Sequence, residues 1–263
     1  ATMAPAVLAG LGYLVLGPAL RPAALITAAT GVLAAFAAAL LLTRGRGERG
    51  EPPGRHVLRS VRPGLIGATW YGLCSAVFLL HAEAPYLMGR LDIAVTVAPL
   101  IAAMGFVEWR AERFRPQAVA LTRRSARPSD FQRHVWLLIS RETLACLAVT
   151  GGLGVLLLGG LFAADRLSAE AAAMTAAHVV LGAAYYAAFL LAGYERFGRL
   201  CTFLLAAIAL HLGLGAWLGA APLLGRSAAP LTDTMLYLGS VLALQGLFLL
   251  GLVPIVGRVR HFR

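Results

Sequence analysis

The sequence predicts an all-α protein, a polytopic membrane helix bundle of about eight transmembrane helices with both termini in the cytoplasm. The 263 residues are 59% hydrophobic and 13% charged, whereas a soluble domain carries roughly a quarter charged residues. Apolar stretches of about twenty residues recur from end to end, and each is long enough to cross a hydrocarbon core about 30 Å thick. Arginine-rich and arginine-poor connections alternate between these stretches, which is typical of a chain that threads a membrane.

Breaks in hydrophobicity delimit the predicted helices. The first is short for a full span and contains Pro5 and Pro18, so a re-entrant piece or the remnant of a truncated helix is an alternative. The chain opens in an apolar region without a signal-peptide pattern, which leaves open that the sequence begins inside a longer protein. The predicted helices are 3–18, 22–43, 64–83, 92–109, 136–162, 171–193, 199–220 and 233–257.

These helices fall into two groups. Residues 1–43 form a two-helix N-terminal membrane segment, and residues 64–263 form a six-helix membrane bundle. Residues 44–63 between them are rich in Arg, Gly and Pro, a composition that predicts a flexible cytoplasmic linker without a core of its own. The segment from Glu108 to Trp136 mixes arginines with aromatic residues, and we expect it to lie along the cytoplasmic membrane surface.

The basic residues behind the formal net charge of +11 are distributed along the chain as a membrane topology requires. The sequence contains no lysine, and 19 of the 23 arginines lie in four segments, 44–63, 110–141, 194–199 and 258–263. The alternate connections hold the other four arginines. This bias places the four richer segments in the cytoplasm. Arginines there meet lipid headgroups first, so we expect membrane lipids with anionic headgroups as partners and no nucleic acid.

Polar residues inside the predicted helices are the candidate substrate-binding residues. His178 and His211 lie near the middles of their helices. Their position indicates a proton relay, a substrate contact or an interhelical hydrogen bond. A pair of haem ligands is a further alternative. Arg141 and Glu142 lie inside a helix, where they either contact an anionic headgroup or neutralise each other. Gln245 is the only strongly polar side chain well inside the last helix.

Charged residues at one helix end form a candidate gate. Glu83, Arg90 and Asp92, with His81 nearby, cluster around the end of the helix 64–83 and the turn after it. The alternative interpretation is that they are solvated loop residues, because a charge costs little free energy at a membrane interface.

No motif predicts catalysis, a metal or a cofactor. The three cysteines are far apart, and each lies in an apolar run, so they predict neither a disulfide framework nor a metal site. A nucleotide-binding glycine loop, a zinc-protease motif and a nucleophile elbow are all missing. We therefore predict no catalytic residues and no cofactor, and an enzyme remains the less favoured class.

The helix layout resembles the flippases of the multidrug/oligosaccharidyl-lipid/polysaccharide superfamily. WYGLCSAVFLLHAEAPYLMG resembles the helix that opens their second lobe, and APLIAAMGFVEWRAERFRP resembles the next helix and loop of the exopolysaccharide members. GYERFGRLCTFLLAAIALHLGLG is similar in layout to their tenth-to-eleventh helix region. The chain would then match the end of a first lobe followed by a whole second lobe. It lacks the aspartate expected within WYGLCSAVFLLHAEAP, so no family residue is carried over.

The resemblance implies a multi-pass transport protein of the plasma (inner) membrane that flips or exports a lipid-linked glycan or exopolysaccharide. Its mechanism would be alternating access between helix bundles, and partner membrane subunits or a glycan synthase complex are expected. Three alternatives stay open: an ABC-type exporter permease subunit, a membrane-embedded transferase, and a structural subunit of a membrane complex.

Overall fold

The computed structural model describes residues 55–86, 89–125, 127–219 and 230–256. The chain divides into two units, Ala1–Leu65 and Ile66–Arg263, and the second is described below. The predicted helices 3–18 and 22–43 lie outside the described residues, as does the first half of the predicted linker.

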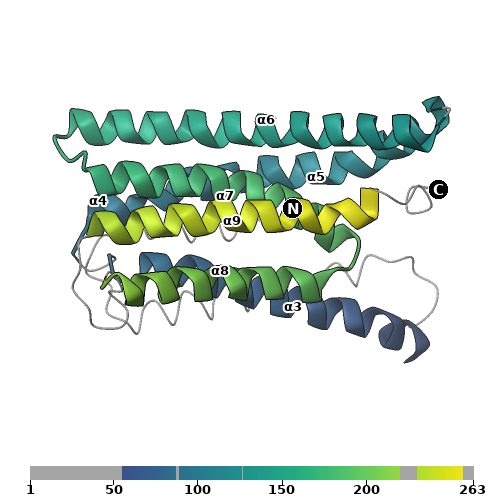
Figure 1. The fold of residues 1–263 in the computed structure, drawn as a ribbon, viewed down its shortest axis with the longest axis horizontal. Helices are drawn as coiled ribbons and strands as arrows, with labels where there is room; N and C mark the ends of the chain where they lie inside the picture. The colour runs from purple at the N-terminus through teal and green to yellow at the C-terminus, as the bar shows by residue number, and fades with distance from the viewer. Residues whose placement is uncertain (1–54, 87–88, 126, 220–229, 257–263) are drawn as a thin grey trace. The chain divides into compact units, whose positions relative to one another are not determined.

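Every element of the described residues is helical, so the predicted all-α class is confirmed there (Figure 1). Five of these helices are long and apolar enough to cross a membrane. The count of about eight spans and the location of the termini stay predictions. The elements are α3 (Arg55–Glu83), α4 (Leu91–Ala94), η2 (Val95–Val97), α5 (Ala98–Arg124), α6 (Pro128–Ala163), α7 (Ala169–Gly193), α8 (Phe197–Trp217) and α9 (Pro230–Val256).

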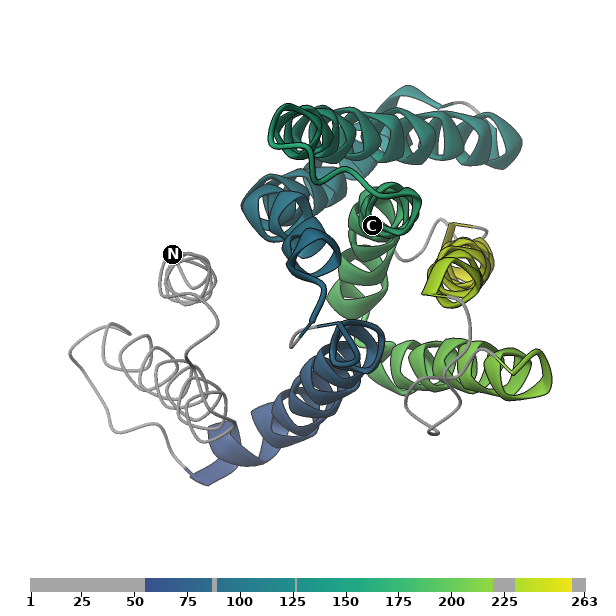
Figure 2. The ribbon, with the colours of Figure 1, turned by 90° about the vertical axis from the view of Figure 1, so that its left-hand side faces the viewer.

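Helix α7 is the centre of the second unit (Figure 2). It packs against α5, α6 and α9, and α8 packs against α9. Small residues let its neighbours approach closely. A Cβ atom added to Gly182 of α7 would lie 2.6 Å from Cγ2 of Thr150 on α6, so only glycine fits at this crossing. Because α7 is surrounded, the polar side chains that it carries face other helices.

Many large apolar side chains lie on the outer faces of α6, α8 and α9. Large hydrophobic side chains are exposed on the surface of the single chain, among them Val155, Leu156 and Phe162 of α6 and Leu250 of α9. A helix that is hydrophobic all round belongs in a core or in a membrane. These faces have no helix of the described chain over them, so a membrane is the environment that suits them.

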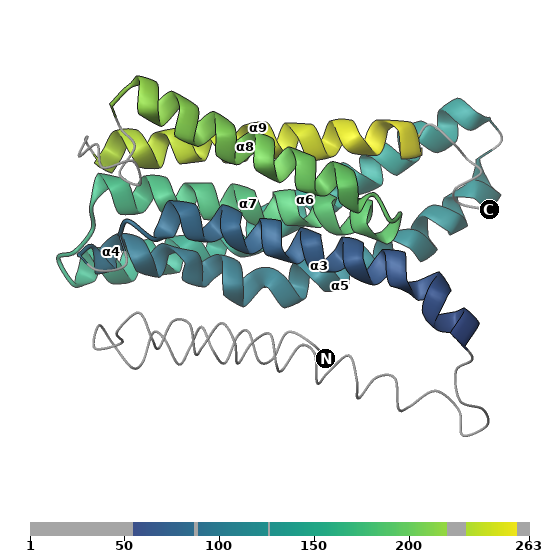
Figure 3. The same ribbon diagram turned by 90° about the horizontal axis from the view of Figure 1, so that it is seen from below.

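The predicted surface segment 108–136 belongs to two long helices. Helix α5 continues through Pro116 to Arg124, and α6 begins at Pro128, where proline is favoured at a first helical position. The buried side chains of Phe114 and Phe131 extend the contact between these helices. Residues 108–136 are therefore parts of two continuous helices, and α5 and α6 run past the ends of α7 and α9 (Figure 3). Their location at the membrane surface stays a prediction.

The described helices alternate in direction, so their turns gather at two ends. The α5–α6 turn and the α7–α8 turn lie at one end, called here the arginine-rich end (Figure 1). The α6–α7 turn and α4 lie at the opposite end. Helix α3 begins at Arg55 rather than Gly64, and it ends at Glu83 near α4. The last residues of α3 meet residues near the middle of α7, in the second half of α8 and at the beginning of α9.

Candidate functional site

Five ionisable side chains meet inside the second unit, toward the end opposite the arginines. We call them the histidine–carboxylate cluster: His81, Glu83, His178, His211 and Asp233. They come from four helices, α3, α7, α8 and α9. All except His81 are buried, and His81 is half-buried. Buried ionisable groups between apolar helices cost free energy, so such a cluster indicates a functional site.

Glu83 and His178 form the first part of the cluster. Oε1 of Glu83 lies 3.1 Å from Nε2 of His178. On its other side, His178 places Nδ1 3.3 Å from the hydroxyl of Thr96, which donates its own proton to the carbonyl of Ile93 at 2.7 Å. The hydroxyl can therefore only accept from His178, so Nδ1 carries a hydrogen and Nε2 faces the carboxyl group.

The polar atoms of this pair are poorly satisfied. Both carboxyl oxygens of Glu83 and Nε2 of His178 are buried without a well-aligned hydrogen bond among the described residues, although Oε1 and Nε2 are close. Leaving such atoms unpaired costs about 1–3 kcal/mol each, and more for charged groups. A single proton between Oε1 of Glu83 and Nε2 of His178 would satisfy both atoms.

His81, His211 and Asp233 form the second part, a continuous hydrogen-bonded chain. Nδ1 of His81 contacts the carbonyl of Phe78 at 2.5 Å, and Nε2 contacts Nδ1 of His211 at 2.9 Å. Nε2 of His211 lies 3.1 Å from Oδ1 of Asp233. The carbonyl can only accept, so Nδ1 of His81 is protonated. Two further protons then occupy the two remaining contacts.

Tyr86 closes this chain. Its hydroxyl donates to Oδ2 of Asp233 at 2.5 Å. Burial, and then the hydrogen bond to Asp233, raise the pKa of Tyr86 above its ordinary value, so the phenol remains a donor. Tyr86 therefore ends the hydrogen-bonded chain at Asp233.

Tyr237 lies between the two parts. Its ring centroid is 5.9 Å from that of His81, 6.0 Å from that of His178 and 5.7 Å from that of His211. The side chain is fully buried, and its hydroxyl has no hydrogen-bond partner among the described residues. One aromatic ring thus contacts all three histidines, and it couples the positions of both parts by packing.

The predicted gate residues separate into two places. Arg90 and Asp92 form a bidentate pair, with distances of 3.0 and 2.9 Å, and Arg90 also contacts Glu170 at 3.3 Å. Ser168 donates to Asp92 at 2.6 Å and caps α7. The hydrogen bond to Asp92 raises the pKa of Arg90. This half-exposed group joins α4 to α7, whereas Glu83 belongs to the histidine–carboxylate cluster.

Arg141 and Glu142 lie apart from the histidines. Glu142 is buried and pairs with Arg141 at 2.8 Å and with Arg110 of α5. Arg141, which is largely exposed, also reaches Gln117. The carboxylate is therefore neutralised between two arginines at the α5–α6 contact. The predicted helix ends at residue 109, whereas α5 continues to Arg124 and so includes Arg110.

Gln245 joins neither group. Its side-chain oxygen is buried without a partner among the described residues, and it lies two turns beyond Tyr237 on α9, about 12 Å along the axis. Of the eight predicted site residues, three belong to the histidine–carboxylate cluster: His178, His211 and Glu83. Sequence reasoning missed Asp233, because an acidic residue at the start of a predicted helix looks like a capping residue.

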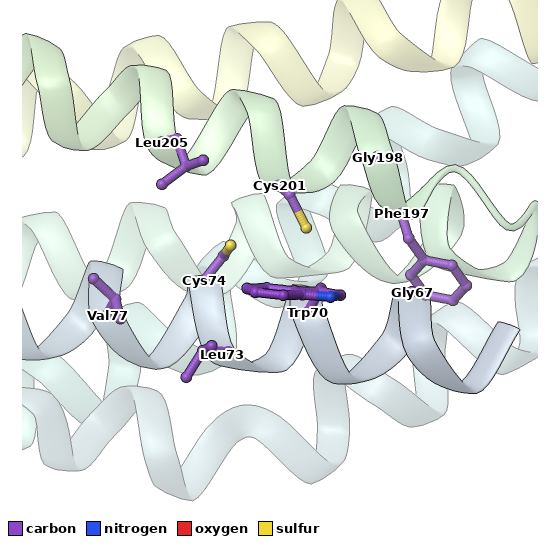
Figure 4. Close-up of a pocket in the computed structure, with 9 residues that line it drawn as sticks. All are labelled: Gly67, Trp70, Leu73, Cys74, Val77, Phe197, Gly198, Cys201 and Leu205. Atoms are coloured by element: carbon purple, nitrogen blue, oxygen red, sulfur yellow. The ribbon is translucent and has the colours of Figure 1, made fainter. Parts of the chain in front are cut away.

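An apolar pocket of about 480 Å³ lies between α3 and α8 (Figure 4). Trp70 and Cys74 line it from α3, and Gly198 and Cys201 line it from α8. The two cysteine side chains point toward each other across it (Figure 4). The pocket lies nearer the arginine-rich end than the histidine–carboxylate cluster does, since His81 and His211 are further along the same two helices.

Comparisons of this chain with protein-family models, with curated proteins and with solved structures find no match.

Proposed function

We propose that this chain is a multi-pass transport protein of the plasma membrane, in which the histidine–carboxylate cluster couples proton movement to transport. One observation carries the proposal: two carboxylic acids and three histidines meet around Tyr237 inside a bundle of apolar helices. Chains of Asp, Glu and His within membrane segments are typical of proton relays in pumps and transporters. The pair Glu83–His178 and the chain His81–His211–Asp233 each accommodate protons in more than one position.

The cluster also joins helices that would have to move. Its members come from α3, α7, α8 and α9, so a change in protonation alters contacts between four helices at once. Alternating access needs such a bistable set of contacts between helices. The cargo class that we propose, a lipid-linked glycan, follows from the resemblance in helix layout.

A test uses liposomes that contain the purified protein and a fluorescent nitrobenzoxadiazole-labelled polyprenyl diphosphate sugar. Dithionite bleaches the label in the outer leaflet, and a flipping protein exposes the inner pool. We expect faster bleaching than in empty liposomes, a further increase with an imposed pH gradient, and loss of that increase in Glu83→Gln. Glu112→Gln on the exposed face of α5 serves as the control. Bleaching equal to that of empty liposomes would overturn the proposed cargo, and a gradient response retained in Glu83→Gln would overturn the coupling role.

A membrane-embedded transferase is the second candidate, because the same cluster contains groups suited to general acid–base catalysis. The two functions differ in product. Mass spectrometry of the labelled lipid after incubation would reveal a transferred or lost sugar for the enzyme, whereas a transporter returns the lipid chemically unchanged.

A further inference from the structure

We propose that the pocket between α3 and α8 binds one acyl chain of an anionic phospholipid, with the lipid phosphate held by Arg196 and Arg199. This site is separate from the histidine–carboxylate cluster, and lipid binding there is independent of the proposed cargo. It requires only that α3 and α8 face the membrane, as their exposed apolar side chains indicate.

The lining of the pocket suits hydrocarbon. Its walls are formed by the side chains of Trp70, Leu73 and Val77 on α3 and of Phe197 and Leu205 on α8. Trp70, Leu73 and Val77 are each exposed by 44% or more, so the pocket opens sideways rather than into the bundle. A volume of about 480 Å³ is within the usual range for sites of small ligands.

The length of the pocket fits one leaflet. It extends along α3 from Gly67 to Val77, which at 1.5 Å per residue is about 15 Å. The hydrocarbon core of a bilayer is about 30 Å thick, so the pocket covers the depth of a single acyl layer. It begins beside Phe197, at the arginine-rich end, and this places one end of the pocket at headgroup level.

Positive charge lies at that end. Arg196 and Arg199 flank the lining residues Phe197 and Gly198, and both are exposed. Among the described residues neither arginine takes part in an ion pair. Glu195 is also in this turn, so the turn carries a net charge of +1. Arginine beside an apolar pocket complements a phosphate attached to an acyl chain, because guanidinium binds phosphate through several hydrogen bonds. An anionic glycerophospholipid combines both parts.

Trp70 makes the binding measurable, since brominated acyl chains quench tryptophan fluorescence on contact. Trp109, Trp136 and Trp217 are replaced by Phe so that Trp70 is the only reporter. The protein in detergent micelles is then titrated with dibrominated phosphatidylglycerol or with dibrominated phosphatidylcholine of the same chain length. We expect half-maximal quenching at a lower mole fraction of phosphatidylglycerol, by about fivefold for each arginine at the headgroup, because the choline of phosphatidylcholine offsets the charge of its phosphate.

Two kinds of variant separate the parts of the site. Arg196→Gln with Arg199→Gln should make the two lipids equal. Gly198→Leu should weaken quenching by both, because nothing lies within 4 Å of a Cβ atom at Gly198 and the new side chain would enter the pocket. Gly213→Leu is the matched control: it is an exposed glycine on the same helix, also with open space at Cβ, and it does not line the pocket.

Three results would overturn the proposal. Equal quenching by the two lipids in the Trp70-only protein would mean ordinary annular lipid. A preference that survives replacement of both arginines would place the phosphate elsewhere. Absence of quenching by either lipid would mean that another segment of the chain or a second copy fills the pocket. Size-exclusion chromatography of every variant shows whether it is folded. If Gly198→Leu fails to fold, the arginine variants still test the proposal, because they leave the pocket walls intact.

Discussion

Oε1 of Glu83, the last residue of α3, lies 3.1 Å from Nε2 of His178 in the middle of α7, and both side chains are buried. The two residues are 95 positions apart in the chain. Their contact brings an acid from the end of one apolar helix to a base on the central helix. It is the contact on which the proposed proton coupling depends most directly.

Removal of one member of this pair should destabilise the protein strongly. In His178→Ala the acid of Glu83 stays buried without a base, and we expect a loss of about 3–5 kcal/mol in unfolding free energy. Glu83→Ala should cost less than that, because a histidine can remain neutral. The measurement is reversible unfolding in mixed detergent micelles.

The double variant provides the check on this interpretation. We expect Glu83→Ala with His178→Ala to cost less than the sum of the single variants, by about 0.5–3 kcal/mol. Glu112→Ala, which changes an exposed acid on α5, should stay within about 0.5 kcal/mol of the wild type. Strict additivity of the two single variants would contradict a direct interaction.

The two buried tyrosines that contact the histidine–carboxylate cluster should respond differently to loss of their hydroxyls. Tyr86 donates to Asp233 at 2.5 Å, so Tyr86→Phe should cost about 1.5–3 kcal/mol, the range for hydrogen bonds to charged groups. The hydroxyl of Tyr237 has no partner among the described residues, so Tyr237→Phe should be neutral or stabilising. Thermal unfolding of both variants side by side tests the contrast, and a larger loss for Tyr237→Phe would show that its hydroxyl is bonded.

Helix positions were predictable from hydrophobicity, but helix neighbours were not. The predicted helix 171–193 matches α7, and the predicted helix 233–257 matches α9 within a few residues. Apolar length and arginine placement determine these spans, and both can be counted in the sequence. Which helix faces which depends on packing between helices that are apolar on all sides, and hydrophobicity does not distinguish their faces.

The candidate site shows the same limit. His178 and His211 were predicted because a polar residue in the middle of an apolar helix stands out. Asp233 and Glu83 lie at helix ends, where a charge needs no partner, so the sequence offered no reason to pair them with histidines. Arg110 lay one residue beyond a predicted helix end, and only the longer α5 brings it against Glu142.

The two arginines that contact Glu142 should contribute unequally. The side chain of Arg110 is 21% exposed and that of Arg141 is 65% exposed, so water screens the second pair far more. Arg141→Ala should cost about 1 kcal/mol or less. Arg110→Ala leaves a buried carboxylate with one exposed partner, and we expect a loss of several kcal/mol, up to about 3–5. Detergent unfolding curves of the two variants check the order, and equal losses would contradict it.

The contact between α6 and α7 should tolerate no side chain at Gly182. A Cβ atom there would lie 2.6 Å from Cγ2 of Thr150, and Thr150 is itself held by a hydrogen bond of 2.7 Å to the carbonyl of Cys146. The threonine cannot rotate away without breaking that bond, so Gly182→Ala should cost about 1–3 kcal/mol through overpacking. Gly152→Ala on α6, where nothing lies within 4 Å of the added atom, should be neutral or slightly stabilising because alanine has the higher helix propensity. Unfolding of Gly182→Ala with Thr150→Ser completes the test: the serine removes the clashing methyl group and keeps the hydroxyl, so it should recover most of the loss. If it recovers none, the α6–α7 approach is not what excludes a side chain at this position.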